Sequence, residues 1–115
     1  MSKYAIRCTI HDGSWQDYEN LHSALATIGC FRNILADNGT RYSLPDATYV
    51  CTTLMSVEQL RDAVVQLAQR VSPPGTGPEV IVFEWGNSAW YLKPAPAQAT
   101  VPLATLAALG LPVYR

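Results

Sequence analysis

The stretch KYAIRCTIHDGSWQDYENLHSALATIG, residues 3–29, changes from the hydrophobic period of a strand to that of a helix. Apolar and polar side chains alternate over residues 3–11, which predicts a β-strand with one buried face and one polar face. Ser14 followed by Asp17 matches a capping box, in which each side chain binds a free backbone amide at a helix start. An apolar stripe at helical spacing follows and ends at Gly29, which can adopt the left-handed conformation of a helix end. This stripe predicts a helix that faces the core through Trp15, Tyr18, Leu21, Leu25 and Ile28.

A hairpin signal lies after this first strand and helix. Residues 30–36 form a second strand candidate, and Asp37-Asn38-Gly39 is a sequence that tolerates the positive backbone angles of a tight turn. The returning strand is predicted to begin near Thr40 and to run to Thr52. Pro45 interrupts it, because proline cannot donate a ladder hydrogen bond, so we expect a bulge or kink around residues 44–46.

A second helix and a further strand complete the pattern. Ser56 and Gln59 repeat the capping box, and apolar residues at helical spacing continue to Val71. The proline- and glycine-rich residues 72–78 are typical of a loop, and residues 79–85, EVIVFEW, are rich in strand-forming residues. Gly86-Asn87 is expected to turn the chain into a short fifth strand over residues 89–92.

The order strand-helix-strand-strand-helix-strand predicts an α+β fold of the ferredoxin-like type, with a four-stranded antiparallel sheet and two helices on one face. We assign residues 1–95 to this domain. Residues 96–115 are predicted to form a Pro/Ala-rich linker and an apolar C-terminal tail, which either packs on the domain as a strap or docks a partner. The other face of the sheet is expected to be open and to present Arg7, Thr9 and His11. A homodimer is the expected way of covering such a face.

Composition limits the possible functions. The chain has 115 residues, a formal net charge of −1 and a pI near 6.0, so a broad basic surface for nucleic acid is excluded and any contact with RNA must be local. The three cysteines, Cys8, Cys30 and Cys51, have no metal-like spacing and predict buried thiols in a reducing compartment. With neither an N-terminal signal nor an apolar run of about 20 residues, we expect a cytoplasmic protein.

The end of the first strand is the candidate chemical site. The topology is expected to bring Asp12 near the Asp37-Asn38 turn, Arg41 and Glu79 on one rim of the sheet. Paired carboxylates there could hold Mg²⁺, with Asp12 as the metal ligand, and stabilise charge on a scissile phosphate. Alternatively, His11 could act as a general base oriented by a carboxylate. A structural alternative stays open, because an Asp-Gly pair before a helix is an ordinary loop.

Other polar and aromatic residues have two possible uses. Arg7, Arg32 and Arg41 are the candidates for holding RNA phosphates. His22 lies on the first helix and is expected at the edge of the core or on the surface rather than in a catalytic role. The remaining aromatic residues could stack on unpaired bases or pack in the core or a dimer interface; they are Tyr42, Tyr49, Trp85, Trp90 and Tyr91.

The runs KYAIRCTIHDGSWQDYENLHSALATIGCFRNI, YSLPDATY and EVIVFEW carry a family resemblance. Over about residues 3–93 the chain resembles small bacterial and prophage proteins grouped with the type V toxin–antitoxin endoribonuclease antitoxins (GhoS type). The resemblance implies a ferredoxin-like fold akin to the small nuclease subunit of CRISPR adaptation complexes, and cleavage of the messenger RNA of a membrane-lytic toxin. In that subunit an acidic residue at the end of the first strand can help to bind a metal between the dimer halves, and Asp12 matches this position.

Two functions therefore remain open. The first is a small endoribonuclease-like antitoxin that acts on single-stranded RNA, with Asp12 and His11 as catalytic residues and Mg²⁺ as the possible cofactor. The second is a non-enzymatic protein-binding module, such as a phage-borne inhibitor of a CRISPR-type host defence complex, which docks a partner through the open sheet face or the C-terminal tail.

Overall fold

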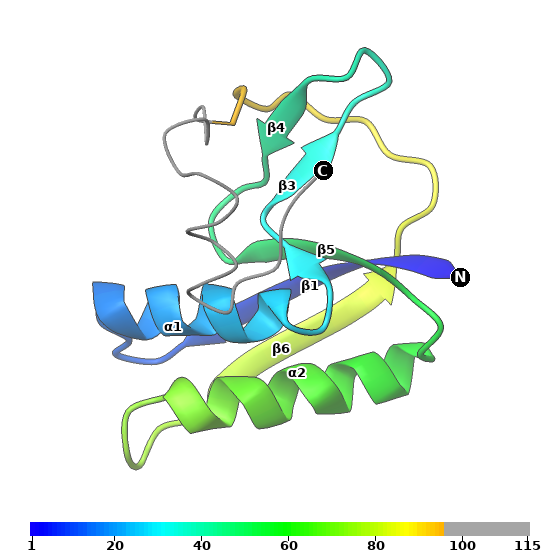
Figure 1. The fold of residues 1–115 in the computed structure, drawn as a ribbon. Helices are drawn as coiled ribbons and strands as arrows, with labels where there is room; N and C mark the ends of the chain where they lie inside the picture. Colours follow the sequence, from blue (N-terminus) through cyan, green and yellow to red (C-terminus); the bar gives the residue numbers. More distant parts are fainter. Residues whose placement is uncertain (96–115) are drawn as a thin grey trace.

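The computed structural model describes residues 1–95, so the linker and tail predicted for residues 96–115 lie outside the described residues. The predicted α+β architecture is confirmed: a four-stranded antiparallel sheet in the order β2-β5-β1-β6 carries two helices on one face (Figure 1). A second sheet, formed by a two-stranded hairpin, is added to it. The elements in chain order are β1 (Ser2–Ile10), α1 (Trp15–Ala26), β2 (Cys30–Phe31), β3 (Asn33–Leu35), β4 (Arg41–Ser43), β5 (Thr48–Thr53), α2 (Val57–Val71) and β6 (Pro78–Glu84).

Strand β1 is central and pairs with β5 on one side and β6 on the other. Its helix-facing side chains are buried, as the alternation predicts: Tyr4, Ile6, Cys8 and Ile10. Leu21 and Leu25 of α1 and Leu60 and Val64 of α2 cover them and are themselves fully buried. Burial of each such aliphatic side chain contributes about 1.5–3 kcal/mol to stability, so this layer is the core of the protein.

Both predicted capping boxes are present. Asp17 N donates to Ser14 Oγ at 3.1 Å, and Ser14 N donates to a carboxylate oxygen of Asp17 at 3.0 Å. Ser56 and Gln59 make the same reciprocal pair at the start of α2. Each box satisfies two backbone amides that have no partner inside the helix, which explains why both helices begin where the sequence predicts.

The three cysteines are buried and free, as expected from their apolar surroundings. Burial raises the pKa of Cys8 to about 11, so its thiol stays protonated at neutral pH.

One core assignment is wrong. Trp15 is 75% exposed, because it is the first residue of α1 and the buried positions of this helix begin only at Leu21. Tyr18, one turn later, is half-buried and packs against the core as predicted.

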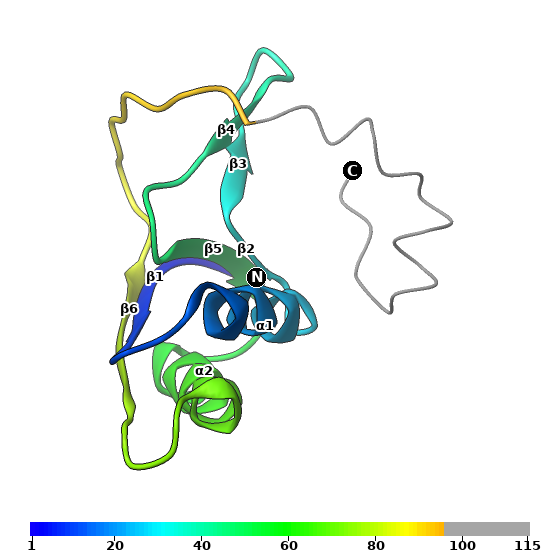
Figure 2. The same ribbon diagram turned by 90° about the vertical axis from the view of Figure 1, so that its left-hand side faces the viewer.

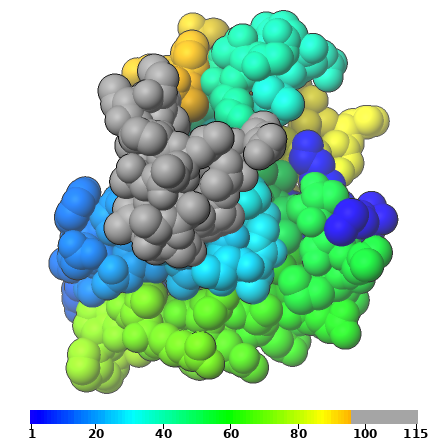
Figure 3. Space-filling model, viewed as in Figure 1, coloured from blue at the N-terminus to red at the C-terminus, as the bar shows by residue number. Residues whose placement is uncertain are grey.

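The predicted second strand, residues 30–36, is broken at Arg32. Leu44 N donates to Arg32 O at 2.7 Å, and the chain turns there, so β2 stays in the main sheet while β3 leaves it. Strands β3 and β4 form the predicted hairpin around Gly39, which has a φ of 83°. This hairpin rises on the side of the main sheet that faces away from the helices (Figure 2), and it projects from the body of the molecule (Figure 3).

The predicted kink in the returning strand is confirmed, since residues 44–47 separate β4 from β5. Ala47 adopts a φ of 61°, and its carbonyl accepts a hydrogen bond from Cys8 N at 3.0 Å. The left-handed conformation costs a residue with a side chain about 1–2 kcal/mol, so this ladder bond holds the bend in place.

The predicted fifth strand at residues 89–92 is not formed. After β6 the chain crosses to the hairpin and contacts the outer edge of β4 at residues 93–95, just after the predicted strand. Ser43 N donates to Lys93 O at 3.0 Å, and Ala95 N donates to Arg41 O at 2.9 Å. The rings of Tyr42 and Trp90 contact each other with centroids 5.1 Å apart. The segment after β6 therefore completes the hairpin sheet rather than the main sheet.

Gly13 supplies a test of the packing between the end of β1 and α1. A Cβ at this position would lie 3.0 Å from the Tyr18 ring and 3.1 Å from the Ile10 side chain. We predict that Gly13→Ala lowers the free energy of unfolding by about 1–2 kcal/mol, as overpacking does elsewhere. Urea denaturation measures this change.

Gly77→Ala is the matched control, because a Cβ there meets nothing within 4 Å. It should leave stability unchanged or raise it by about 0.5 kcal/mol, since alanine reduces the entropy of the unfolded chain. Equal effects of the two substitutions would contradict the proposed packing.

Candidate functional site

The chain turns sharply at the end of β1. Gly13 N donates to Ile10 O at 3.4 Å, and Asp12 occupies the left-handed region with a φ of 55°. Aspartate is among the few residues with a side chain that adopt this conformation readily. The turn therefore gives Asp12 a structural reason to be at this position, and the residue is exposed.

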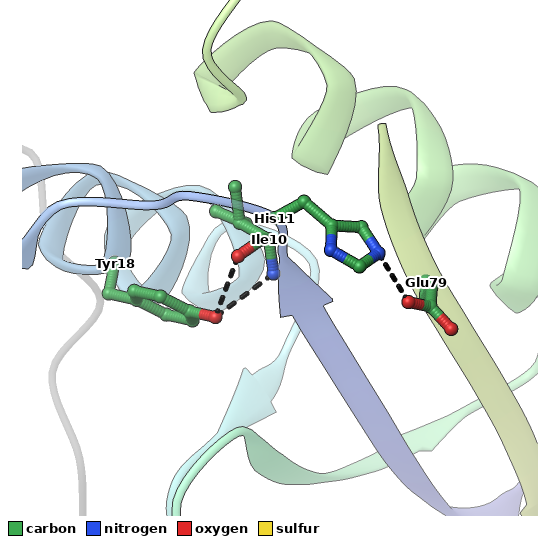
Figure 4. Close-up of polar contacts among 4 residues, drawn as sticks. All are labelled: Ile10, His11, Tyr18 and Glu79. Atoms are coloured by element: carbon green, nitrogen blue, oxygen red, sulfur yellow. Dashed lines mark hydrogen bonds and ion pairs between the residues drawn. The ribbon is translucent and has the colours of Figure 1, made fainter. Parts of the chain in front are cut away.

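His11 makes a polar contact across to β6. Its Nε2 lies 2.5 Å from Glu79 Oε1 (Figure 4), as the antiparallel register, which pairs Thr9 with Glu79, allows. The side chains are 63% and 70% exposed, so the pair adds little to stability. When Nε2 carries the proton donated to Glu79, Nδ1 is left as a hydrogen-bond acceptor, which is how a carboxylate sets the tautomer of a catalytic histidine.

Tyr18 fixes the position of this strand end relative to α1. Its hydroxyl donates to Ile10 O at 3.2 Å and accepts from Ile10 N at 3.0 Å (Figure 4). The backbone that carries His11 is thus held by a side chain from the helix. Such support is what a functional side chain on a strand end requires.

The rim predicted around Asp12 forms only in part. Glu79 lies at the end of β1 as expected, but the hairpin that carries Asp37 and Arg41 leaves the main sheet, and Figures 1 and 2 place its tip far from the end of β1. The reason is the break at Arg32, which diverts β3 and β4 into their own sheet.

Within residues 1–95, no three His, Cys, Asp or Glu side chains lie together in a way that could hold a metal ion. A Mg²⁺ ion at Asp12 would need its other ligands from substrate phosphates and water. The expectation of Mg²⁺ at this residue stays a prediction.

The β1–β6 half of the sheet face away from the helices carries a mixed charged and apolar surface, which we call the open face; Ala5 and Val50, on the same face, are buried. It is formed by the outward side chains of two paired strands: Lys3, Arg7 and Thr9 of β1, and Glu79, Ile81, Phe83 and Trp85 at and just after β6. Ile81, which is opposite Arg7, is 60% exposed, and Phe83 is 50% exposed. Lys3 Nζ lies 5.0 Å from the centroid of the Trp85 ring.

The three candidate arginines occupy separate places. Arg7 is exposed on the open face, whereas Arg32 lies at the break between β2 and β3. Arg41 belongs to the hairpin, where its guanidinium donates to Asn33 Oδ1 at 3.4 Å. Only Arg7 shares a surface with His11 and the exposed apolar side chains of β6.

A pocket that the sequence did not indicate lies between α1 and the bend before β5. Its volume is about 650 Å³, and its lining includes Trp15, His22 and Arg32 together with residues 44–47. The exposed Trp15 side chain forms part of the pocket wall. No sequence pattern identifies the pocket, because its walls come from three separate segments, residues 15–22, 32–33 and 43–47.

His22 connects the pocket to the core. Its Nδ1 lies 2.7 Å from the hydroxyl of Tyr49, which is fully buried. Burial, together with the positive charge of Arg32, lowers the pKa of His22 to about 4, although Asp46 acts in the opposite direction. His22 is therefore neutral at pH 7, and its place at the edge of the core agrees with the prediction.

None of the helices described for residues 1–95 is long and apolar enough to cross a membrane. Searches of family models, of curated proteins and of solved structures found no match to this chain.

The pKa of His22 predicts a pH-dependent stability. The folded-state pKa of about 4 is below the ordinary value of 6.5. The contribution of neutral His22 to the free energy of unfolding is therefore complete above pH 6.5 and is lost as the pH falls toward 4. After allowance for partial exposure, the loss should be about 1–2 kcal/mol. Thermal unfolding of the wild type and His22→Gln between pH 7 and pH 4.5 measures it.

The variant lacks the titrating group, so its stability should change less over this range than that of the wild type. His11→Gln is the matched control, because it removes an exposed histidine that lies outside the core. If His22→Gln and the wild type show the same pH dependence, the proposed neutral, core-edge state of His22 is incorrect.

Proposed function

We propose that the protein binds single-stranded RNA on the open face of its sheet and acts as an endoribonuclease-like antitoxin. The observation that carries the proposal is the placement of Arg7 beside the exposed Ile81 and Phe83 on that face. An aromatic ring can stack on an unpaired base while a neighbouring guanidinium binds the adjacent phosphate.

Two basic side chains lie on this surface. The chain as a whole has a net charge of −1, and the open face bears Lys3 and Arg7 against Glu79, with Asp12 in the adjoining turn. An RNA contact here therefore depends on these two side chains and not on a net positive surface.

His11 is the proposed general base of the cleavage step. Glu79 accepts a hydrogen bond from Nε2–H, which keeps the proton on Nε2, and Nδ1 removes the proton from a ribose 2′-hydroxyl. The 2′-oxygen then forms a bond to the adjacent phosphorus, and the bond to the 5′-oxygen breaks, with a proton from water going to the leaving oxygen. Arg7, on the same face, is the proposed partner of the negative charge on the phosphate, and this route is the alternative to one assisted by Mg²⁺ at Asp12.

Binding and cleavage are separable by substitution. We predict that Phe83→Ala and Arg7→Gln each weaken the binding of a fluorescent, mixed-sequence 12-mer RNA about 5- to 20-fold, measured by anisotropy. Arg70→Gln, which removes the same charge from the helix side, should bind as the wild type does. Equal loss in Arg7→Gln and Arg70→Gln would point to general electrostatics rather than to the open face.

His11→Gln should lower the cleavage rate at least about 100-fold and leave RNA affinity within about twofold, because a general base acts on the chemical step. A gel assay with end-labelled RNA measures the rate. Parallel reactions of the wild type and Asp12→Asn with Mg²⁺ or EDTA test the metal role of Asp12, which requires a loss of rate in EDTA. Unchanged cleavage by His11→Gln would refute the assignment of the base.

A protein-binding module without enzymatic activity, such as an inhibitor of a CRISPR-type defence complex, is the second proposal. It is favoured by the pocket between α1 and residues 44–47, whose wall includes the exposed Trp15. A large exposed aromatic side chain beside a pocket is typical of an interface hot spot.

The two proposals predict different sensitive residues. If the protein is a binding module, Trp15→Ala should weaken its binding to a purified CRISPR-type complex at least tenfold in a calorimetric titration, and Phe83→Ala should not. RNA cleavage would then be absent in the wild type. The reverse pattern, with RNA cleavage present and Trp15→Ala silent, supports the nuclease.

A further inference from the structure

Strand β6 forms a border of the main sheet. It pairs with β1 along its whole length, and within residues 1–95 no strand pairs with its other edge. Figure 2 shows β6 as the outermost strand on the side away from β2. An unpaired border strand presents backbone donors and acceptors that can pair with another chain.

The register identifies the unpaired backbone groups. Trp85 N donates to Lys3 O at 2.8 Å, so the odd-numbered residues of this segment bond to β1. In an antiparallel ladder the residues between them point their N–H and C=O groups to the outer edge. These residues are Val80, Val82 and Glu84. Pro78, which has no N–H, lies opposite Ile10 at a position that makes no bond to β1, as this alternation requires.

The other strand edges of the described chain are shorter or occupied. Strand β2, at the opposite border, has two residues, and the outer edge of β4 is bonded to Lys93 and Ala95. Strand β6 has seven residues and two valines among its outward-bonding positions. Its edge is therefore the longest one that remains available for pairing in residues 1–95.

We propose that two copies of the chain pair antiparallel through β6, with the two-fold axis at Val82. Val82 then faces Val82 of the second copy, and Val80 faces Glu84 of the second copy. The outward groups of these residues form about six backbone hydrogen bonds, two for each directly bonded pair. The result is a dimer with one continuous sheet.

The exposed side chains select this register. With the axis at Val82, Ile81 lies directly opposite Phe83 of the second copy, at a non-hydrogen-bonded position where side chains approach most closely. Aromatic and β-branched residues stabilise each other in such cross-strand pairs. No two glutamates oppose each other, because Glu84 faces Val80 and Glu79 faces Trp85 of the second copy. An axis at Ile81 would instead place Glu84 opposite Pro78, which has no N–H to donate.

The pairing covers Ile81 and Phe83 from the side and leaves both open faces on the same surface of the joined sheet. Trp85 of each copy then lies near the His11–Glu79 pair of the other. The inference goes beyond the proposed function and does not rest on it, because it follows from the strand edge and the register alone.

A charge-pairing experiment tests the interface and its register. One variant carries Ile81→Glu with Phe83→Glu, and a second carries Ile81→Lys with Phe83→Lys. Sedimentation equilibrium from about 1 to 100 μM should give a dimer for the wild type and a monomer for each variant, because like charges then face each other. An equimolar mixture of the two variants should again give a dimer, since each Glu faces a Lys.

Leu35→Glu is the matched control, because Leu35 is similarly exposed but lies in the hairpin, and it should remain dimeric. Circular dichroism checks that each variant is folded. The mass of the wild type from sedimentation equilibrium tests the dimer even if a variant fails to fold. A wild type that is monomeric at 100 μM overturns the proposal. So does a dimer in either charged variant alone, or a mixture that stays monomeric.

Discussion

The pairing of β1 with a strand on each side is the constraint on which the rest of the structure depends. A strand paired on both sides has no freedom to slip, since a shift of one residue would move Ile6 and Cys8 from the core to the opposite face. The core under α1 and α2 therefore fixes which side chains lie on the other surface. Arg7 lies on the open face because Ile6 and Cys8 are buried.

A second constraint is the bend between β4 and β5. The left-handed conformation of Ala47 and the hydrogen bond from Leu44 to Arg32 turn the chain out of the main sheet and back again. The bend separates the hairpin, with Arg41, from the end of β1. It also forms one wall of the pocket beside Trp15 and His22. The same local structure thus divides the candidate residues into two surfaces, one for each proposed function.

The sequence predicts the elements whose signals are local. Alternation in β1, the two capping boxes and the turn at Gly39 each depend on residues close together in the chain, and each is confirmed. The break at Arg32 was missed because it depends on a hydrogen bond with Leu44. The exposed position of Trp15 depends on how far α1 extends over the sheet, which periodicity alone does not define.

The candidate site was likewise predicted in part and missed in part. The proximity of Glu79 to the end of β1 was predicted from strand order, and the contact between Glu79 and His11 agrees with it. The open face was only half predicted, because residues 79–85 are apolar on both sides of the strand and the pattern does not reveal which side is covered. Val80 and Val82 face the helices, and this leaves Ile81 and Phe83 exposed.

We propose that the open face, and not the pocket, is the functional surface. Its most direct test is an NMR titration of ¹⁵N-labelled protein with a short single-stranded RNA, read as changes in amide chemical shift. We expect the largest changes in residues 3–11 and 79–85 and small changes in α2. Changes confined to Trp15, His22 and residues 44–47 would contradict it, as would the absence of any change at millimolar RNA.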